Sequence, residues 1–275
     1  MNKYTFIGPF SQILPMTGLP LKGALSDHQL TPIENGGILI EDKKIYAVGP
    51  YLDLQKEAKD LNANVLPIDS KMVCLPGFID AHTHICFGGS RAKDYALRNA
   101  GKTYQEIAKA GGGIWETVIQ TRNTNMGELV SGIKQRADRH LHQGATTIEV
   151  KSGYGLSLEK ELEMLIAIAD ADKIIVPDLI PTCLAAHMVP IDYRGTPSEY
   201  LTEIGTELFP ILKEKRLTNR IDAFVEEGSF SASQIAPYLK KAKAMGFDIT
   251  IHADQFSTGG SAIAVKYGAI SADHL

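Results

Sequence analysis

Several features are scarce in this 275-residue chain, and each absence excludes a class of protein. The three cysteines, Cys74, Cys86 and Cys183, form no Cys-x-x-Cys pair, which argues against a disulfide framework and against a cysteine-based zinc site. No basic run and no apolar stretch of about 18 residues occurs, so we expect neither a nucleic-acid partner nor a membrane span. With a net charge of −4 and no apolar leader segment, we expect a cytoplasmic protein that acts on a small molecule.

The sequence changes character near residue 73. Residues 1–73 read as short strands and turns, and the runs Gly37–Ile40 and Ile45–Gly49 flank the polar turn Glu41–Lys44, which predicts a hairpin. Residues 74–275 alternate apolar β-type runs with amphipathic helical stretches, a pattern typical of parallel βαβ units. We therefore predict a small β-rich domain followed by a larger α/β domain.

Six β-type runs, each short and rich in Ile, Val, Thr or Phe, follow one another in the second region. They are Gly77–His84, Ala145–Lys151, Leu179–His187, Ile221–Glu226, Phe247–His252 and Ala269–His274. Six strand–helix units in order predict a TIM-like (β/α) barrel, and a closed barrel needs about eight. We therefore expect a barrel truncated after its sixth strand. An open, six-stranded, doubly wound sheet is the alternative.

The first of these runs ends in a His-x-His pair. Residues two apart on a strand point to the same side, so His82 and His84 are expected to project together at the C-terminal end of the strand. Barrel enzymes hold their active sites at that end, and paired imidazoles suit Zn, Fe or Ni. The alternative is an accidental pair. We predict that these two histidines supply half of a metal site.

Three further histidines, His187, His252 and His274, end the third, fifth and sixth runs. A single histidine is more often a hydrogen-bonded core residue. The chain has only eight histidines, however, and chance would rarely place four of them at the ends of four of the six runs. Placement at the end of the fifth run makes His252 the candidate third ligand. A metal ion held by imidazoles with one open position activates water for attack on a carbonyl or amidine carbon.

Two other side chains follow strand ends. Arg91 lies seven residues beyond His84 and could pair with a substrate carboxylate, or form a surface salt bridge instead. Tyr154 follows the second run and could donate its phenol to a substrate, or pack as a loop aromatic. The glycines at 111–113 lack the Gly-Lys-Ser/Thr of a phosphate-binding loop, so we expect no phosphate site there.

The segment from Pro76 to His84 resembles the amidohydrolase superfamily, and further segments narrow the resemblance to the imidazolonepropionase family. Those segments are Gly111–Ile114, Glu149–Leu156, His252–Gln255 and Ser271–His274. The resemblance implies an amidohydrolase-type barrel at 74–275, with residues 1–73 as the N-terminal part of a small β-sandwich domain built from both chain ends. It also implies a homodimer, which is usual among these relatives.

The resemblance implies one Zn or Fe ion held by His82, His84 and His252, with a last ligand, an aspartate on the eighth strand, that has no counterpart in this sequence. Dinuclear relatives place a modified lysine on the fourth strand. Here the fourth run, Ile221–Glu226, has none, so one metal ion is expected. The implied reaction is hydrolysis of the cyclic amide of 4-imidazolone-5-propanoate to N-formimino-L-glutamate, in histidine degradation.

The resemblance further implies that Arg91, Tyr154, His187 and Gln255 contact this substrate. Proton transfer is expected from His274 or from the missing aspartate, because a glutamine at position 255 has no titratable group. His187 or the metal would stabilise the developing oxyanion. Two alternatives are a sibling ring amidohydrolase, such as a cytosine or guanine deaminase, and a truncated, non-catalytic chain.

Overall fold

The computed structural model describes residues 3–21, 23–69, 71–103, 106–107 and 110–275. The chain divides into two compact units, Met1–Gly77 and Phe78–Leu275, and each is treated separately below. Every helix among the described residues is too short or too polar to span a lipid bilayer.

The first unit is a five-stranded sheet with a helix packed on it. Its elements are β1 (Tyr4–Ile13), η1 (Asp27–Gln29), β2 (Ile33–Glu41), β3 (Lys44–Pro50), α1 (Tyr51–Asp60), β4 (Asn64–Pro67) and β5 (Val73–Cys74). The sheet order is β3-β2-β1-β4, with β5 beside β1. The predicted hairpin is confirmed, because β2 and β3 pair antiparallel around the turn at Asp42. Phe6, Leu39, Leu54 and Ala58 form the core. That this unit belongs to a larger β-sandwich stays a prediction.

The second unit is built on six parallel strands, as predicted. They are β6 (Phe78–Asp80), β7 (Ala145–Lys151), β8 (Asp178–Ala186), β9 (Arg220–Val225), β10 (Asp248–Ala253) and β11 (Ser271–Asp273). Their order in the sheet is the order of the chain, β11-β10-β9-β8-β7-β6. A doubly wound sheet reverses its strand order at a switch point, and this sheet does not, so that alternative is wrong.

The sheet curls into a half-barrel. Strands lie about 4.8 Å apart, so the two edges of a flat six-stranded sheet would be separated by roughly 24 Å. Instead, Nδ1 of His82, two residues beyond β6, lies 2.8 Å from Oδ2 of Asp273 on β11. The C-terminal ends of the first and sixth strands therefore meet across the interior of the sheet.

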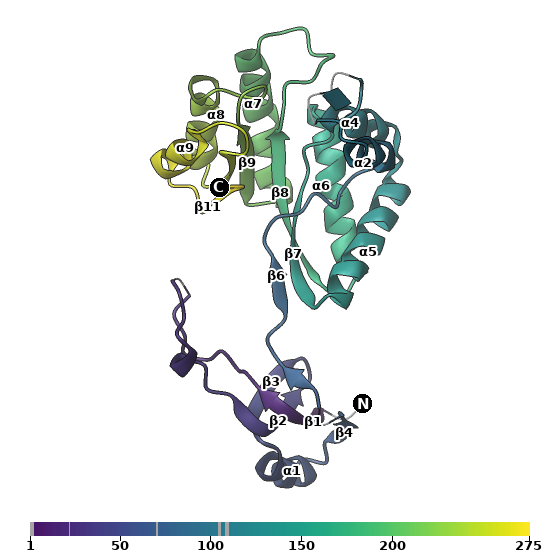
Figure 1. Cartoon of the computed structure of the whole chain (residues 1–275), viewed down its shortest axis with the longest axis vertical. Coiled ribbons are helices and arrows are strands. Elements are labelled where there is room, and N and C mark those ends of the chain that lie inside the picture. The colour runs from purple at the N-terminus through teal and green to yellow at the C-terminus, as the bar shows by residue number, and fades with distance from the viewer. Residues whose placement is uncertain (1–2, 22, 70, 104–105, 108–109) are drawn as a thin grey trace. The chain divides into compact units, whose positions relative to one another are not determined.

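Seven described helices follow the strands of this unit (Figure 1). They are α2 (Ala92–Asn99), α4 (Ile114–Asn123), α5 (Met126–His142), α6 (Leu158–Asp172), α7 (Pro197–Lys215), α8 (Ala232–Ala244) and α9 (Gly260–Tyr267). Their starts follow from local chemistry, since Asn125, Thr196 and Ser231 each form a capping box at the N-terminus of α5, α7 and α8. These caps satisfy backbone N–H groups that have no partner within the helix.

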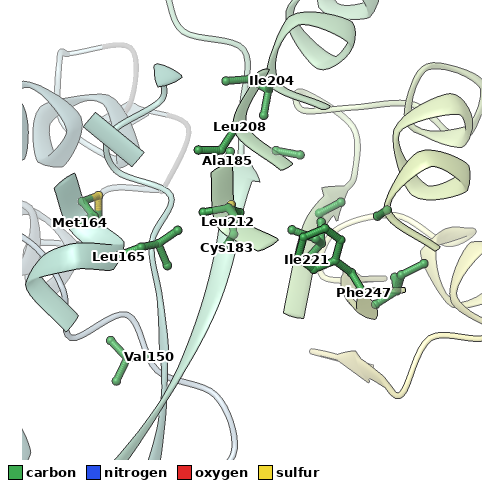
Figure 2. Close-up of a cluster of buried hydrophobic side chains, with 14 of the residues drawn as sticks. Val150, Met164, Leu165, Cys183, Ala185, Ile204, Leu208, Leu212, Ile221 and Phe247 are labelled. Carbon is green, nitrogen blue, oxygen red and sulfur yellow. The ribbon is translucent and has the colours of Figure 1, made fainter. Parts of the chain in front are cut away.

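Apolar side chains between the helices and strands form the core of the second unit (Figure 2). Leu165 on α6, Cys183 on β8 and Leu208 on α7 are all fully buried. Burial of such side chains is the main source of stability for the scaffold. The core fixes the strands, and the strands in turn fix the polar groups at their C-terminal ends.

Two strands are shorter than predicted, which changes the setting of the histidines. The first ends at Asp80 rather than at His84, and the last ends at Asp273 rather than at His274. Beyond β6 the chain still runs beside β7, because the Thr83 carbonyl accepts from the Lys151 N–H at 3.0 Å. His274 has a φ of +82°, which takes its backbone out of the extended conformation.

Candidate active site

Three histidine nitrogens converge at the C-terminal ends of the strands. Nε2 of His84 lies 3.3 Å from Nε2 of His82 and 3.2 Å from Nε2 of His252. His82 and His84 follow β6, and His252 lies on β10, near the opposite edge of the sheet. The curl of the sheet therefore brings together the three residues predicted as metal ligands.

Carboxylates orient two of these rings. Nδ1 of His82 lies 2.8 Å from Asp273 Oδ2, and Nδ1 of His252 lies 3.0 Å from Asp222 Oδ1. A carboxylate accepts, so in the neutral ring the proton is on Nδ1 and the lone pair is on Nε2. Metal-binding histidines are commonly fixed in this way, by a carboxylate on the nitrogen remote from the ion.

The arrangement fits a metal ion. Two Nε2 lone pairs, from His82 and His252, point toward the Nε2 of His84, an arrangement that a cation would stabilise. Zinc–nitrogen bonds of about 2.0–2.1 Å place tetrahedral ligand atoms about 3.3–3.4 Å apart, and the two printed Nε2 separations are 3.3 and 3.2 Å. Nδ1 of His84 is buried and has no hydrogen-bond partner among the described residues. Burial, with the nearby His187 and His252, holds the pKa of His84 well below its usual value, which keeps its ring neutral.

His274 lies at the rim of the same cluster. Ligand atoms of His82, His252 and His274 all lie within 4.8 Å of one another. The His274 ring centroid is 4.9 Å from that of His82 and 5.1 Å from that of His252. His274 is exposed as a whole, but partial desolvation of its ring, together with the nearby His252 and His82, lowers its pKa. The residue predicted for proton transfer therefore adjoins the predicted ligands.

His187 and Tyr154 form one wall of the site. The His187 ring centroid lies 5.5 Å from that of His84, and the Tyr154 centroid lies 5.4 Å from that of His187. Nδ1 of His187 donates to the Gly153 carbonyl at 2.9 Å, so the neutral ring has its lone pair on Nε2. Burial and the nearby His252 lower the pKa of His187 to about 3. His187 is thus a neutral hydrogen-bond acceptor near pH 7.

A cavity of about 240 Å³ adjoins this wall. Its lining is largely apolar and includes Trp115, Met188, Phe224 and Phe256 together with His187. Glu227 and Ser229 also line the cavity, so a small molecule there would meet an apolar enclosure with a few polar groups.

Sequence reasoning missed a buried ionic network beneath the histidines. Lys151, on β7, is fully buried, and its Nζ lies 2.7 Å from Asp222 Oδ2 and 2.8 Å from Glu149 Oε1. Burial alone would lower the pKa of Lys151, but Asp222 and Glu149 outweigh that effect and leave it raised. Burial acts to raise the pKa of Asp222, yet His252 and Lys151 hold it well below its usual value. The ammonium and the Asp222 carboxylate are therefore both charged near pH 7.

A signal for this network was present in the sequence. Glu149, Lys151 and Asp222 lie inside apolar runs of the parallel βαβ pattern. Strands of a parallel sheet are buried on both faces, so a charged residue there needs a partner. The partners could not be assigned, because Lys151 and Asp222 are 71 positions apart in the chain.

Arg91 and Gln255 are placed differently from the other predicted residues. Among the described contacts, the Arg91 guanidinium donates to Asp94 at 2.6 Å and to Thr117 at 3.0 Å. Gln255 is exposed on the loop that follows β10. The next residue, Phe256, donates its N–H to Glu226 at 2.9 Å, which ties this loop to the end of β9. A role for Arg91 or Gln255 in binding substrate stays a prediction.

Comparison with known proteins gives the relatives of this chain. The model of the amidohydrolase family matches residues 73–274. The chain is similar to an imidazolonepropionase of Bdellovibrio bacteriovorus, with 40% identity over 269 residues, and to one of Bacillus mycoides, with 45% identity over 248 residues. These alignments cover 96% and 90% of this chain but 62% and 57% of those proteins. The chain thus spans about three fifths of the length of the curated relatives it matches.

Solved structures give the same fold at low sequence identity. The chain is similar to E. coli guanine deaminase, with a TM-score of 0.63 and 14% identity, over 96% of this chain and 59% of that one. It is also similar to atrazine chlorohydrolase TrzN from Arthrobacter aurescens TC1 complexed with zinc, with a TM-score of 0.55 and 12% identity, over 96% and 58% of the two chains. At these identities the similarity concerns the fold alone.

Proposed function

Because this chain belongs to the amidohydrolase family, we propose that it is the metal-binding portion of an imidazolonepropionase. The proposed reaction is hydrolysis of the cyclic amide of 4-imidazolone-5-propanoate to N-formimino-L-glutamate, in histidine degradation. The observation that carries the substrate assignment is the 40–45% identity to proteins of that name over nine tenths or more of the chain. The converging histidine nitrogens support the assignment of a hydrolytic centre.

In this proposal His82, His84 and His252 hold one metal ion, Zn or Fe. When bound, the ion would supply Lewis acidity and a water made acidic enough to attack a carbonyl carbon. Asp273 and Asp222 keep the Nδ1 protons of His82 and His252 in place, so that their Nε2 atoms face the ion. His274 adjoins His82 and His252 and is assigned to proton transfer, because it is more exposed than these two.

His187 and Tyr154 are assigned to the substrate ring. Since Nδ1 of His187 donates to the Gly153 carbonyl, its Nε2 has only a lone pair to offer. His187 is therefore suited to accept an N–H of the imidazolone ring. With no proton on Nε2 it is not suited to stabilise an oxyanion, although the sequence had allowed that role. Arg91 is assigned to the propionate, for which it would use donors beyond those that contact Asp94 and Thr117. Gln255 is assigned to a polar contact from the loop after β10.

The proposal is tested with the complete protein as its gene encodes it, by following loss of imidazolonepropionate and release of ammonia together. Ring opening consumes the substrate without releasing ammonia, whereas a deaminase releases one ammonia per turnover. Consumption without ammonia supports the proposal. Ammonia release would favour a deaminase, and no turnover of a metal-loaded preparation would favour a non-catalytic chain.

Replacement of a predicted ligand tests the metal assignment. We expect His252→Ala to lose the bound ion, because an aliphatic side chain offers no donor atom, and to lose activity with it. His142→Ala is the matched control, since His142 is exposed on α5 and its Nδ1 donates to the Asp138 carbonyl. One tightly bound ion per chain in His252→Ala, measured by elemental analysis, would contradict the assignment. A homodimer and a cytoplasmic location stay predictions.

A further inference from the structure

The ammonium of Lys151 lies where carboxylates from three strands converge. It contacts Asp222 Oδ2 at 2.7 Å and Glu149 Oε1 at 2.8 Å, and Asp273 Oδ2 at 3.7 Å. These carboxylates belong to β9, β7 and β11. Lys151 and Asp222 have no exposed side-chain surface, so bulk water does not solvate either charge. A buried charge is tolerated only where it is paired in this way.

Two of the three carboxylates also accept hydrogen bonds from the proposed ligands. Asp222 uses Oδ2 for Lys151 and Oδ1 for His252 Nδ1, at 3.0 Å. Asp273 uses Oδ2 for His82 Nδ1, at 2.8 Å, and the same oxygen faces Lys151. A single ammonium thus restrains the acceptors of two ligand rings that come from different ends of the chain.

The third carboxylate, that of Glu149, contacts Thr83, the residue between the first two proposed ligands. Glu149 Oε1 contacts Lys151, and Oε2 accepts the backbone N–H of Thr83 at 3.3 Å. The Thr83 hydroxyl donates to the Glu149 carbonyl at 2.5 Å. Thr83 lies between His82 and His84, so Glu149 fixes the backbone on which both rings are mounted.

We propose that Lys151 is a positioning residue for the metal centre, acting on its three histidine segments through Glu149, Asp222 and Asp273. This inference rests on the proposed function only as far as the metal site. Three carboxylates and one ammonium leave a formal excess of two negative charges, so the ammonium offsets part of the repulsion among the carboxylates. Without the ammonium the excess becomes three, and the carboxylates repel one another or turn away from the rings that they orient.

The first test measures the dissociation constant of Zn(II) alone, by competition with a chelator, in the complete protein after metal removal. Loss of groups that orient metal ligands weakens binding by about 10- to 100-fold, and we expect that range for Lys151→Met. Lys160→Met is the matched control, because Lys160 is a partly exposed lysine on α6 that pairs with Glu163. Zinc binding by a folded Lys151→Met protein as tight as that of the unaltered protein would overturn the inference.

A second variant covers the case in which Lys151→Met fails to fold. Lys151→Met combined with Glu149→Gln removes one charge of each sign, so it leaves the formal excess of the network at two. We expect this protein to fold and to bind Zn(II) more weakly than Glu149→Gln alone, because Asp222 and Asp273 have lost their shared cation. An affinity equal to that of Glu149→Gln would also overturn the inference.

The proposed function and this inference fail in different ways. If the unaltered protein binds Zn(II) but does not consume imidazolonepropionate, the substrate assignment fails and the role of Lys151 is still decided by the zinc measurement. If the unaltered protein binds no metal, the metal site itself is wrong, and the inference is overturned with it. A dependence of zinc affinity on Lys151 in folded protein is a result that a purely structural lysine would not give.

Discussion

Single residues of the core carry a large share of the stability of the second unit. Leu165, on α6, is fully buried in the core of the second unit (Figure 2). We expect Leu165→Ala to lower the free energy of unfolding by about 2–5 kcal/mol, because it removes apolar burial and leaves a cavity. Urea denaturation measures the change.

The matched control for this prediction is Val265→Ala on α9. Val265 is 83% exposed, so its removal is expected to change the free energy of unfolding by less than about 0.5 kcal/mol. Equal effects of the two substitutions would show that Leu165 is not part of a packed core.

The histidines were predictable one residue at a time, but their partners were not. His82 and His84 were found because their spacing suits a strand, and His252 because it ends one. Asp273 is 191 positions from His82, and no local pattern indicates that the two side chains touch. Charged groups inside apolar runs, such as Lys151, indicate that a network exists without saying what completes it.

At the scale of elements, the loop after β7 positions one wall of the site. Glu161 on α6 is fully buried and accepts backbone N–H groups from Gly153 at 3.0 Å, Gly155 at 2.8 Å and Leu156 at 2.7 Å. Gly153 has a φ of +103°, and a Cβ there would lie 2.9 Å from the Leu184 carbonyl oxygen, so only glycine fits. The Gly153 carbonyl in turn holds His187.

We expect Glu161→Gln to loosen this loop. An amide side chain has one oxygen in place of two, so at least one of the three backbone N–H groups loses its acceptor, at a cost of about 1–3 kcal/mol. Oε1 of Glu161 accepts from both Gly155 and Leu156, and Oε2 accepts from Gly153 alone, so the amide oxygen is expected to keep the first pair and amide hydrogen exchange at Gly153 is expected to become faster. Glu159→Gln, on the exposed face of the same helix, is the control, and slow exchange in Glu161→Gln would contradict the prediction.

Element positions followed from the sequence more closely than element ends did. The hairpin and the six parallel strands were predicted from apolar runs and turns. The ends of β6 and β11 were not predicted. Glu149 holds Thr83, beyond the end of β6, and Lys151 faces Asp273, at the end of β11, and the hydrophobic pattern of the sequence carries no record of such contacts between distant segments.

At the scale of the whole second unit, the half-barrel has two outer strands. Within the described residues, β6 pairs only with β7 and β11 only with β10. Exposed apolar side chains lie at or next to these edges, including Phe78 at 58%, Ile79 at 71% and Ile270 at 54%. Unpaired edges with apolar side chains promote association between molecules.

We therefore expect a protein of these 275 residues alone to be poorly soluble, to self-associate and to lack activity. Size-exclusion chromatography with light scattering measures the association. A monodisperse monomer that hydrolyses imidazolonepropionate would refute this prediction.

The contact between His82 and Asp273 sets a sequence of events during protein synthesis. A chain made from its N-terminus has its first two imidazoles in place early, but the acceptor for one of them is 191 positions further on. Until the ribosome has released that aspartate, the ring is free to rotate, and Lys151 lacks one of its three anions. The cation can therefore be captured in its final setting only after Asp273 has been synthesised, so metal binding follows synthesis of all six strands of the second unit.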